Sequence, residues 1–276
     1  MSPEQPLGIF DSGIGGLSVL REIRRELPAE NLFYVADSGH APYGDKPLSA
    51  IEARAVAITE FLLDQGVKMI VVACNTATGA AAPLLRGRYP IPIVAMEPAV
   101  KPAVARTRSG VVGVLATRQT LASQQFADLL ARIEQDALIL PQPCPGLVEQ
   151  IESGDLDGDV TRCLLERLLS PLLGRGADTL VLGCTHYPHL APLIAELVGP
   201  EVMVLDSGAA VARQVRRRLA AAGLLAPADR VGRERFWTSG DPVMTQRLIA
   251  RLWHPDAVLE HLDAHPHATS CRLPSA

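Results

Sequence analysis

The chain has 276 residues, of which 48% are hydrophobic and 20% charged, with a net charge of -4 at pH 7. This length and composition can bury one large core or two small ones, which argues against disorder. The acidic balance predicts no nucleic-acid binding, and no apolar run approaches the ~20 residues needed to span a membrane. The N-terminal segment lacks the basic and apolar regions of a signal peptide, so we expect a cytoplasmic protein.

Short apolar runs alternate with helical patterns along most of the chain. The first half has four such runs, at residues 6–10, 31–36, 67–73 and 91–96, with helical patterns at 15–28 and 49–66 between them. Buried runs of this kind, separated by helices, are typical of a parallel sheet built from βαβ units.

The pattern then begins again, with apolar runs at residues 109–117, 137–141, 177–184 and 201–208. The repetition predicts an α/β fold of two similar domains, each a mostly parallel sheet flanked by helices, with the active site in the cleft between them. A proline-containing segment, 96–104, is expected to link the domains. A last strand at 235–241 and a helix at 242–253 are expected to return to the first domain. The expected boundaries are 1–97 plus 208–260 for the first domain, 98–207 for the second, and 261–276 for a disordered tail.

Two cysteines occupy matching places in these halves. Cys74, in "VVACNTATGAA", and Cys184, in "LVLGCTHYPHL", each follow an apolar run and precede small polar residues. Ligands bind where the strands of a parallel sheet end, and the N-terminus of a following helix can lower a thiol pKa. A single cysteine in such a place is more often a small buried hydrophobe, but two in matching places favour a chemical role. The other three cysteines are interpreted as packing, loop and tail residues: Cys144, Cys163 and Cys271.

No disulfide framework or structural zinc site is expected, because the five cysteines contain no CxxC pair. His186 and His189 resemble a pair of metal ligands, but no third ligand is evident. His189 is therefore interpreted as a residue at the start of a helix. We predict no metal site.

The other predicted strand ends also carry polar side chains. Asp11 and Ser12 follow the first run, and Asp37 follows the second. Either aspartate could instead cap a helix. The glycines of "DSGIGG" resemble a dinucleotide-binding loop only weakly, because GxGG is not GxGxxG. These loops therefore predict a cleft lined by small polar groups, with a thiol on either wall.

Six segments in order resemble the glutamate racemases, a group within the cofactor-independent aspartate/glutamate racemase family. They are "GIFDSGIGGLSVL", "YVADSGHAPYG", "VVACNTATGAA", "MEPAVKPA", "VLGCTHYPHL" and "LDSGAAVA", and the resemblance runs from residue 7 to about residue 240. It implies interconversion of L-glutamate and D-glutamate by two cysteines, without a cofactor, to supply D-glutamate for peptidoglycan. It also implies a homodimer.

The resemblance also implies roles for individual residues. Cys74 and Cys184 would act as acid and base on opposite faces of Cα, with Cys74 deprotonating the D-enantiomer and Cys184 the L-enantiomer. Asp11 would assist Cys74, and His186 would assist Cys184. The resemblance also gives supporting catalytic roles to Asp37 and Glu152. Glu152 could equally be a surface residue of a helix. The expected substrate-binding residues are Asp11, Ser12, Tyr43, Gly44, Asn75, Thr76, Thr117, Thr120, Thr185 and His186.

Two other functions stay open. The chain could be a racemase of the same superfamily that acts on aspartate or a hydantoin, although the "CNTA" and "CTHYP" loops favour glutamate. It could also be a two-domain amino-acid binding protein in which the cysteines have no chemical role.

Overall fold

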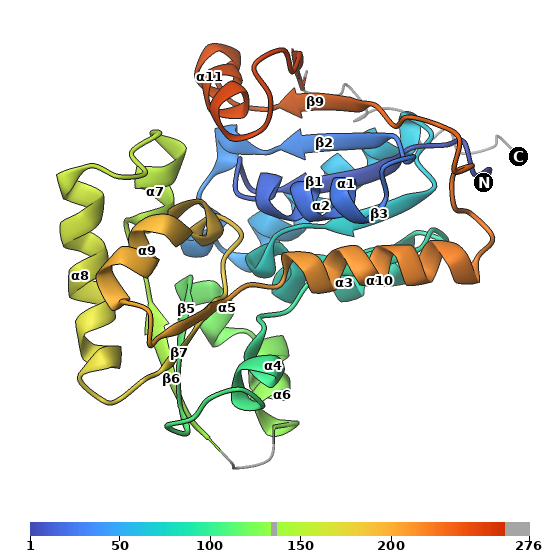
Figure 1. Ribbon diagram of the computed structural model, residues 1–276. Helices are drawn as coiled ribbons and strands as arrows, with labels where there is room; N and C mark the ends of the chain where they lie inside the picture. Colours follow the sequence, from blue (N-terminus) through green and yellow to red (C-terminus); the bar gives the residue numbers. More distant parts are fainter. Residues whose placement is uncertain (134–136, 263–276) are drawn as a thin grey trace, which may run out of the picture.

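The computed structural model describes residues 1–133 and 137–262, which form two separate parallel sheets flanked by helices (Figure 1). The first sheet has the strand order β10-β9-β2-β1-β3-β4. Its strands are β1 (Leu7–Asp11), β2 (Leu32–Ala36), β3 (Met69–Val72), β4 (Ile93–Ala95), β9 (Glu234–Thr238) and β10 (Leu259–His261). All of its neighbouring strands pair in parallel.

The second sheet has the order β6-β5-β7-β8, and its strands are also parallel. Its strands are β5 (Val111–Ala116), β6 (Leu138–Pro143), β7 (Thr179–Leu182) and β8 (Met203–Leu205). The order matches β2-β1-β3-β4 of the first sheet strand for strand. The predicted α/β class with two similar sheets is therefore confirmed, and β3 and β7, which precede the two cysteines, are equivalent strands.

The C-terminal part of the chain returns to the first sheet. Strand β9 pairs with β2 from Glu234 opposite Leu32 to Thr238 opposite Ala36. The predicted tail begins at His261, which ends β10, and from residue 263 onward this tail lies outside the described residues.

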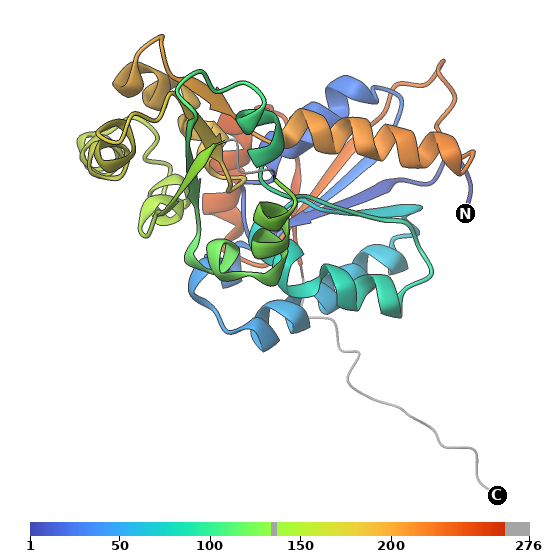
Figure 2. The same cartoon turned by 90° about the horizontal axis from the view of Figure 1, so that it is seen from below.

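Helices cover both faces of the sheets (Figure 2). Around the first sheet lie α1 (Leu17–Glu26), α2 (Leu48–Asp64), α3 (Asn75–Arg88), α10 (Gly208–Ala221) and α11 (Pro242–Leu252). Around the second lie α4 (Val100–Val104), α5 (Arg118–Ala122), α6 (Gln124–Ala131), α7 (Leu147–Glu152), α8 (Asp159–Leu173) and α9 (Ala191–Val198). Short 3-10 helices follow two of the strands: η1 (Ser38–His40) and η2 (Tyr43–Asp45) come after β2, and η3 (Tyr187–Leu190) comes after β7. Within the described residues, no helix combines the length and the apolar character needed to cross a membrane.

Helix α10 shows why these elements pack as they do. Its buried side chains Val211, Val215 and Leu219 recur every four residues and form one apolar stripe. The stripe faces α1, which buries Leu20 and Ile23. These side chains belong to a buried cluster that includes residues of both sheets. The shared core holds the two sheets together, so the loops after their strands can meet at one site.

Candidate active site

Cys74 lies two residues after the end of the fully buried strand β3 and caps the N-terminus of α3. Its sulfur accepts a hydrogen bond from the Ala77 N–H at 3.4 Å, the position that serine or aspartate oxygens usually occupy. Its thiol also lies 3.8 Å from the Ser12 hydroxyl, to which it can donate. The backbone amides at this helix end favour a negative charge, so the site is suited to a thiolate.

The free protein nevertheless keeps Cys74 protonated. Burial, followed by the negative charge of Asp11, raises the pKa of the Cys74 thiol well above its ordinary value. Burial likewise raises the pKa of Asp11, which is fully buried. A positive charge brought in by a ligand, such as the ammonium group of an amino acid, would favour the thiolate.

Asp11 joins the loops after β1 and β7. One carboxylate oxygen accepts hydrogen bonds from the Gly16 N–H at 2.6 Å and from the Thr185 hydroxyl at 3.3 Å. The other oxygen accepts from Ser12 at 3.4 Å. Asp11 is therefore more than a helix cap, because it also contacts the loop that carries Cys184.

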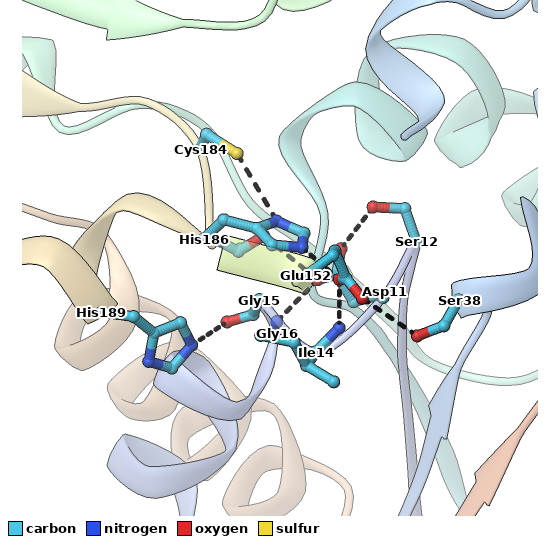
Figure 3. A network of polar contacts seen from close by, with 12 residues as sticks. Asp11, Ser12, Ile14, Gly15, Gly16, Ser38, Glu152, Cys184, His186 and His189 are labelled. Atoms are coloured by element: carbon cyan, nitrogen blue, oxygen red, sulfur yellow. Dashed lines mark hydrogen bonds and ion pairs between the residues drawn. The ribbon is translucent and has the colours of Figure 1, made fainter. Parts of the chain in front are cut away.

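Cys184 has a different set of neighbours. Its sulfur lies 3.7 Å from Nδ1 of His186, and Nε2 of His186 lies 2.6 Å from Oε1 of Glu152 (Figure 3). Burial opposes a charged imidazole, but the hydrogen bonds with Cys184 and Glu152 outweigh it and raise the pKa of His186 well above its ordinary value. An imidazolium beside the sulfur can stabilise a thiolate or supply it with a proton.

Glu152 is not a surface helix residue. Besides His186, its carboxylate accepts hydrogen bonds from the Ile14 N–H at 2.7 Å and from the Ser38 hydroxyl at 3.3 Å (Figure 3). A β-carbon at Gly13 would collide with the Glu152 carboxylate, and one at Gly15 would collide with the His186 ring. The glycine-rich loop after β1 therefore leaves room for these two side chains. This close approach accounts for the glycines, and no bound dinucleotide is needed to explain them.

Three threonine hydroxyls form a second cluster between the sheets. Thr76 lies 2.9 Å from Thr117 and 3.2 Å from Thr120, and Thr117 and Thr120 are themselves 2.9 Å apart. Thr76 is in α3, whereas the other two follow β5. The cluster joins the two halves beside Cys74.

Asn75 is buried beside this cluster. Within the part of the chain that the structure describes, neither its Oδ1 nor its Nδ2 has a hydrogen-bond partner. Buried polar groups are almost always hydrogen-bonded, so an unpaired amide in this place indicates a ligand contact. Gly44 lies against the same threonine cluster, because a β-carbon there would be 3.0 Å from the Thr117 side chain.

Asp37 lies in a separate network. Arg54 binds its carboxylate with two hydrogen bonds, at 2.9 and 2.8 Å, while Tyr43 and Ser239 donate at 2.5 and 2.6 Å. No hydrogen bond joins Asp37 to Cys74 or Cys184 among the described residues. The structure therefore places Asp37 in a paired cluster with Arg54. Tyr43 joins this cluster to the site, because it donates to Asp37 and packs in the same buried cluster as Cys74. Arg54 lies within helix α2, and no pattern in the sequence marks it as a site residue.

His189 packs η3 onto the loop after β1. Its Nε2 donates to the Gly15 carbonyl at 3.2 Å, and burial and then the charge of His186 lower its pKa to about 4. His189 is thus a neutral structural residue at a helix, in agreement with its interpretation from the sequence. Within residues 1–133 and 137–262, no three His, Cys, Asp or Glu side chains are grouped to hold a metal ion.

Cys144 and Cys163 lie outside the polar clusters. Burial raises the pKa of Cys144 to about 12, which makes its thiol unreactive. Cys163 is exposed on α8. The site can therefore use two thiols, one beside Ser12 and Asp11 and the other beside His186, to handle a proton from two sides.

Comparison with known proteins agrees with this geometry. A family model described as Asp/Glu/Hydantoin racemase matches residues 7–215. The chain is 57% identical over 259 residues to a glutamate racemase from Pseudomonas paraeruginosa, covering 94% of this chain and 97% of that one. Among solved structures, it resembles glutamate racemase isoform RacE1 from Bacillus anthracis, with a TM-score of 0.86, 30% identity, and coverage of 95% of this chain and 98% of the other. It also resembles Escherichia coli glutamate racemase in complex with L-glutamate and the activator UDP-MurNAc-ala, with a TM-score of 0.82, 34% identity, and coverage of 94% and 98%.

Proposed function

The chain belongs to the Asp/Glu/Hydantoin racemase family, and we propose that it interconverts L-glutamate and D-glutamate by proton transfer between two cysteines. The observation that carries the proposal is the pair of buried thiols, Cys74 and Cys184, at the ends of the equivalent strands β3 and β7. Glutamate is favoured over aspartate because relatives with high identity and coverage carry that name.

The inversion requires one base and one acid on opposite faces of Cα. With L-glutamate, the Cys184 thiolate takes the Cα proton and forms an S–H bond, and the C–H electron pair stays on carbon. The Cys74 thiol then gives its proton to the other face, which forms the new C–H bond and leaves a thiolate. With D-glutamate the same steps run in reverse. The His186 ring lies beside Cys184, and the Ser12 hydroxyl lies beside Cys74. Each of these neighbours can stabilise the thiolate form of its sulfur.

The carbanion must be stabilised by donors that are already in place. The unpaired amide of Asn75 is suited to bind a substrate carboxylate. Thr76 is the next residue in the sequence, and its hydroxyl contacts those of Thr117 and Thr120. Thr185 holds Asp11, whose negative charge can attract the substrate ammonium group. The site thus offers hydrogen-bond donors to the carboxylate end of the amino acid and a negatively charged acceptor to its ammonium end.

A cofactor has no part in this proposal. A Schiff base would require a lysine at the site, and the chain has only Lys46, Lys68 and Lys101. Lys68 is fully buried 2.6 Å from Glu30, and the other two lie outside the clusters around Cys74 and Cys184. We further propose that the protein is a cytoplasmic homodimer that supplies D-glutamate for peptidoglycan and binds neither nucleic acid nor membrane. Asp37 supports the site by holding Tyr43 in place.

The test is incubation of the purified protein with L-glutamate in D₂O, without an added cofactor. Circular dichroism follows the loss of handedness, and NMR follows deuterium entering at Cα. The Cys74→Ala and Cys184→Ala variants should each lose activity by at least about a hundredfold, whereas Cys163→Ala, at an exposed cysteine, should match the wild type. Activity that survives either of the first two substitutions would exclude the two-thiol mechanism. Turnover of L-aspartate in preference to L-glutamate would overturn the substrate assignment.

A further inference from the structure

The two thiols differ in how each connects to solvent. Cys184, His186 and Glu152 form one chain of contacts, at 3.7 and 2.6 Å. Along it the His186 side chain is 1% exposed, while that of Glu152 is 17% exposed. Cys184 itself is buried, and a substrate Cα placed against its sulfur would cover it further. The imidazole and then the carboxylate remain as its route to water.

Cys74 has no comparable route among the described residues. Its hydroxyl neighbour Ser12 is buried, and Ser12 in turn contacts Asp11, which is fully buried. The oxygens of Asp11 accept hydrogen bonds from Gly16 and Thr185, so this network ends inside the protein.

A racemase with two thiols must reset them. The proposed inversion leaves each sulfur in the protonation state that the other had before, so a second conversion in the same direction needs a proton to leave one thiol and another to reach its counterpart. Cys74, which has no side-chain route to solvent among the described residues, can exchange its proton when the site is empty. A route behind the other thiol lets Cys184 exchange its proton while a ligand still occupies the site.

We propose that Glu152 is the outlet through which Cys184 exchanges its proton with solvent, with His186 as the carrier and Ser38 as a positioning residue. The inference rests on the proposed two-thiol function. With His186 neutral and its proton on Nε2, the thiol proton moves to Nδ1, which breaks S–H and leaves a thiolate and an imidazolium. The imidazolium then gives its Nε2 proton to Oε1 of Glu152, and the carboxylic acid releases that proton to water. Uptake of a proton follows the same steps backwards.

The surroundings of Glu152 fit this role. The Ile14 N–H and the Ser38 hydroxyl bind one carboxylate oxygen each, at 2.7 and 3.3 Å, so both hold the group in place. Both come from loops of the first sheet, whereas Glu152 ends α7 beside the second sheet. The outlet is therefore assembled only when the two halves of the molecule meet.

The test compares two substitutions of Glu152. Glu152→Gln keeps the shape and can still accept a hydrogen bond from Ile14, but it cannot carry a proton. We expect it to lower kcat about a hundredfold, within the range for a lost acid–base group. Glu152→Ala should be equally slow, but sodium formate should restore a several-fold part of its rate, because formate can occupy the space of the missing carboxylate. Ser38→Ala should lower kcat only a few-fold.

The controls separate this role from a structural one. Sodium chloride at the same concentration should give no rescue, and Glu152→Gln should not respond to formate. Glu149→Gln, an exposed residue of the same helix, should retain wild-type kcat. If Glu152→Gln keeps wild-type kcat, or if folded Glu152→Ala shows no rescue, Glu152 is not the outlet. Failure of the wild type to racemise glutamate in the same assay would instead reject the function on which the inference rests.

Discussion

Asn75 and Thr76 are neighbours in the sequence, and we expect their replacement to change the stability of the free protein in opposite directions. Asn75 is buried with both amide atoms unpaired among the described residues. A buried polar group without a partner costs ~1–3 kcal/mol. Asn75→Ala removes this cost but also some packing contacts, so we expect a net gain of about 1 kcal/mol in the free energy of unfolding.

Thr76→Val is the matched change. The Thr76 hydroxyl is paired with Thr117 and Thr120 at 2.9 and 3.2 Å, so its loss should cost about 1 kcal/mol, the typical contribution of a paired hydrogen bond. Both variants should bind glutamate more weakly, with a raised KM. Stability and substrate binding should therefore change together for Thr76 but in opposite directions for Asn75.

Urea unfolding of the ligand-free protein measures the difference. A change of 1 kcal/mol corresponds to about 2 °C in Tm for a chain of this size, so thermal unfolding provides a second measurement. A loss of stability in Asn75→Ala as large as that in Thr76→Val would refute the reasoning. It would show that the Asn75 amide is already satisfied in the free protein.

Two further predictions concern buried charges. Because the pKa of His189 is about 4 in the folded protein and about 6.5 ordinarily, the unfolded chain binds more protons between these values. Stability should fall as the pH falls through this window, and His189→Gln should remove up to ~3 kcal/mol of that loss in urea unfolding at pH 4 relative to pH 7; identical pH profiles would contradict it. Arg54→Ala leaves the buried carboxylate of Asp37 without its bidentate partner and should cost ~3–5 kcal/mol, whereas Arg54→Lys should cost less; an unchanged urea midpoint in the alanine variant would exclude this account.

The features that could be predicted from the sequence are those set by local pattern. Buried parallel strands appear as uninterrupted apolar runs, and the residue after such a run lies at the ligand-binding edge of its sheet. This logic placed Cys74 and Cys184 at equivalent positions, and the strand order confirms that β3 and β7 correspond. The polar residues next to each cysteine followed from the same argument.

Contacts between distant segments could not be predicted in this way. Glu152 reaches Ile14, which is 138 residues away, and Arg54 reaches Asp37 from the interior of a helix. Neither pairing leaves a periodic signal, because each depends on how the two sheets and their helices are placed. The glycines at positions 13 and 15 are evident in the sequence, but the sequence does not show why glycine is needed there. Only the structure shows that they leave room for Glu152 and His186.

The unequal surroundings of the two thiols are compatible with a reaction that has no preferred direction. L-glutamate and D-glutamate have the same free energy in water, so kcat/KM must be equal in the two directions whatever lies beside each sulfur. Differences between the Ser12 side and the His186 side can therefore appear only in kcat and KM taken separately. A fold with two similar halves supplies two thiols at equivalent strand ends. The proposed proton route starts from Cys184 because His186 connects this thiol to Glu152, a partly exposed carboxylate.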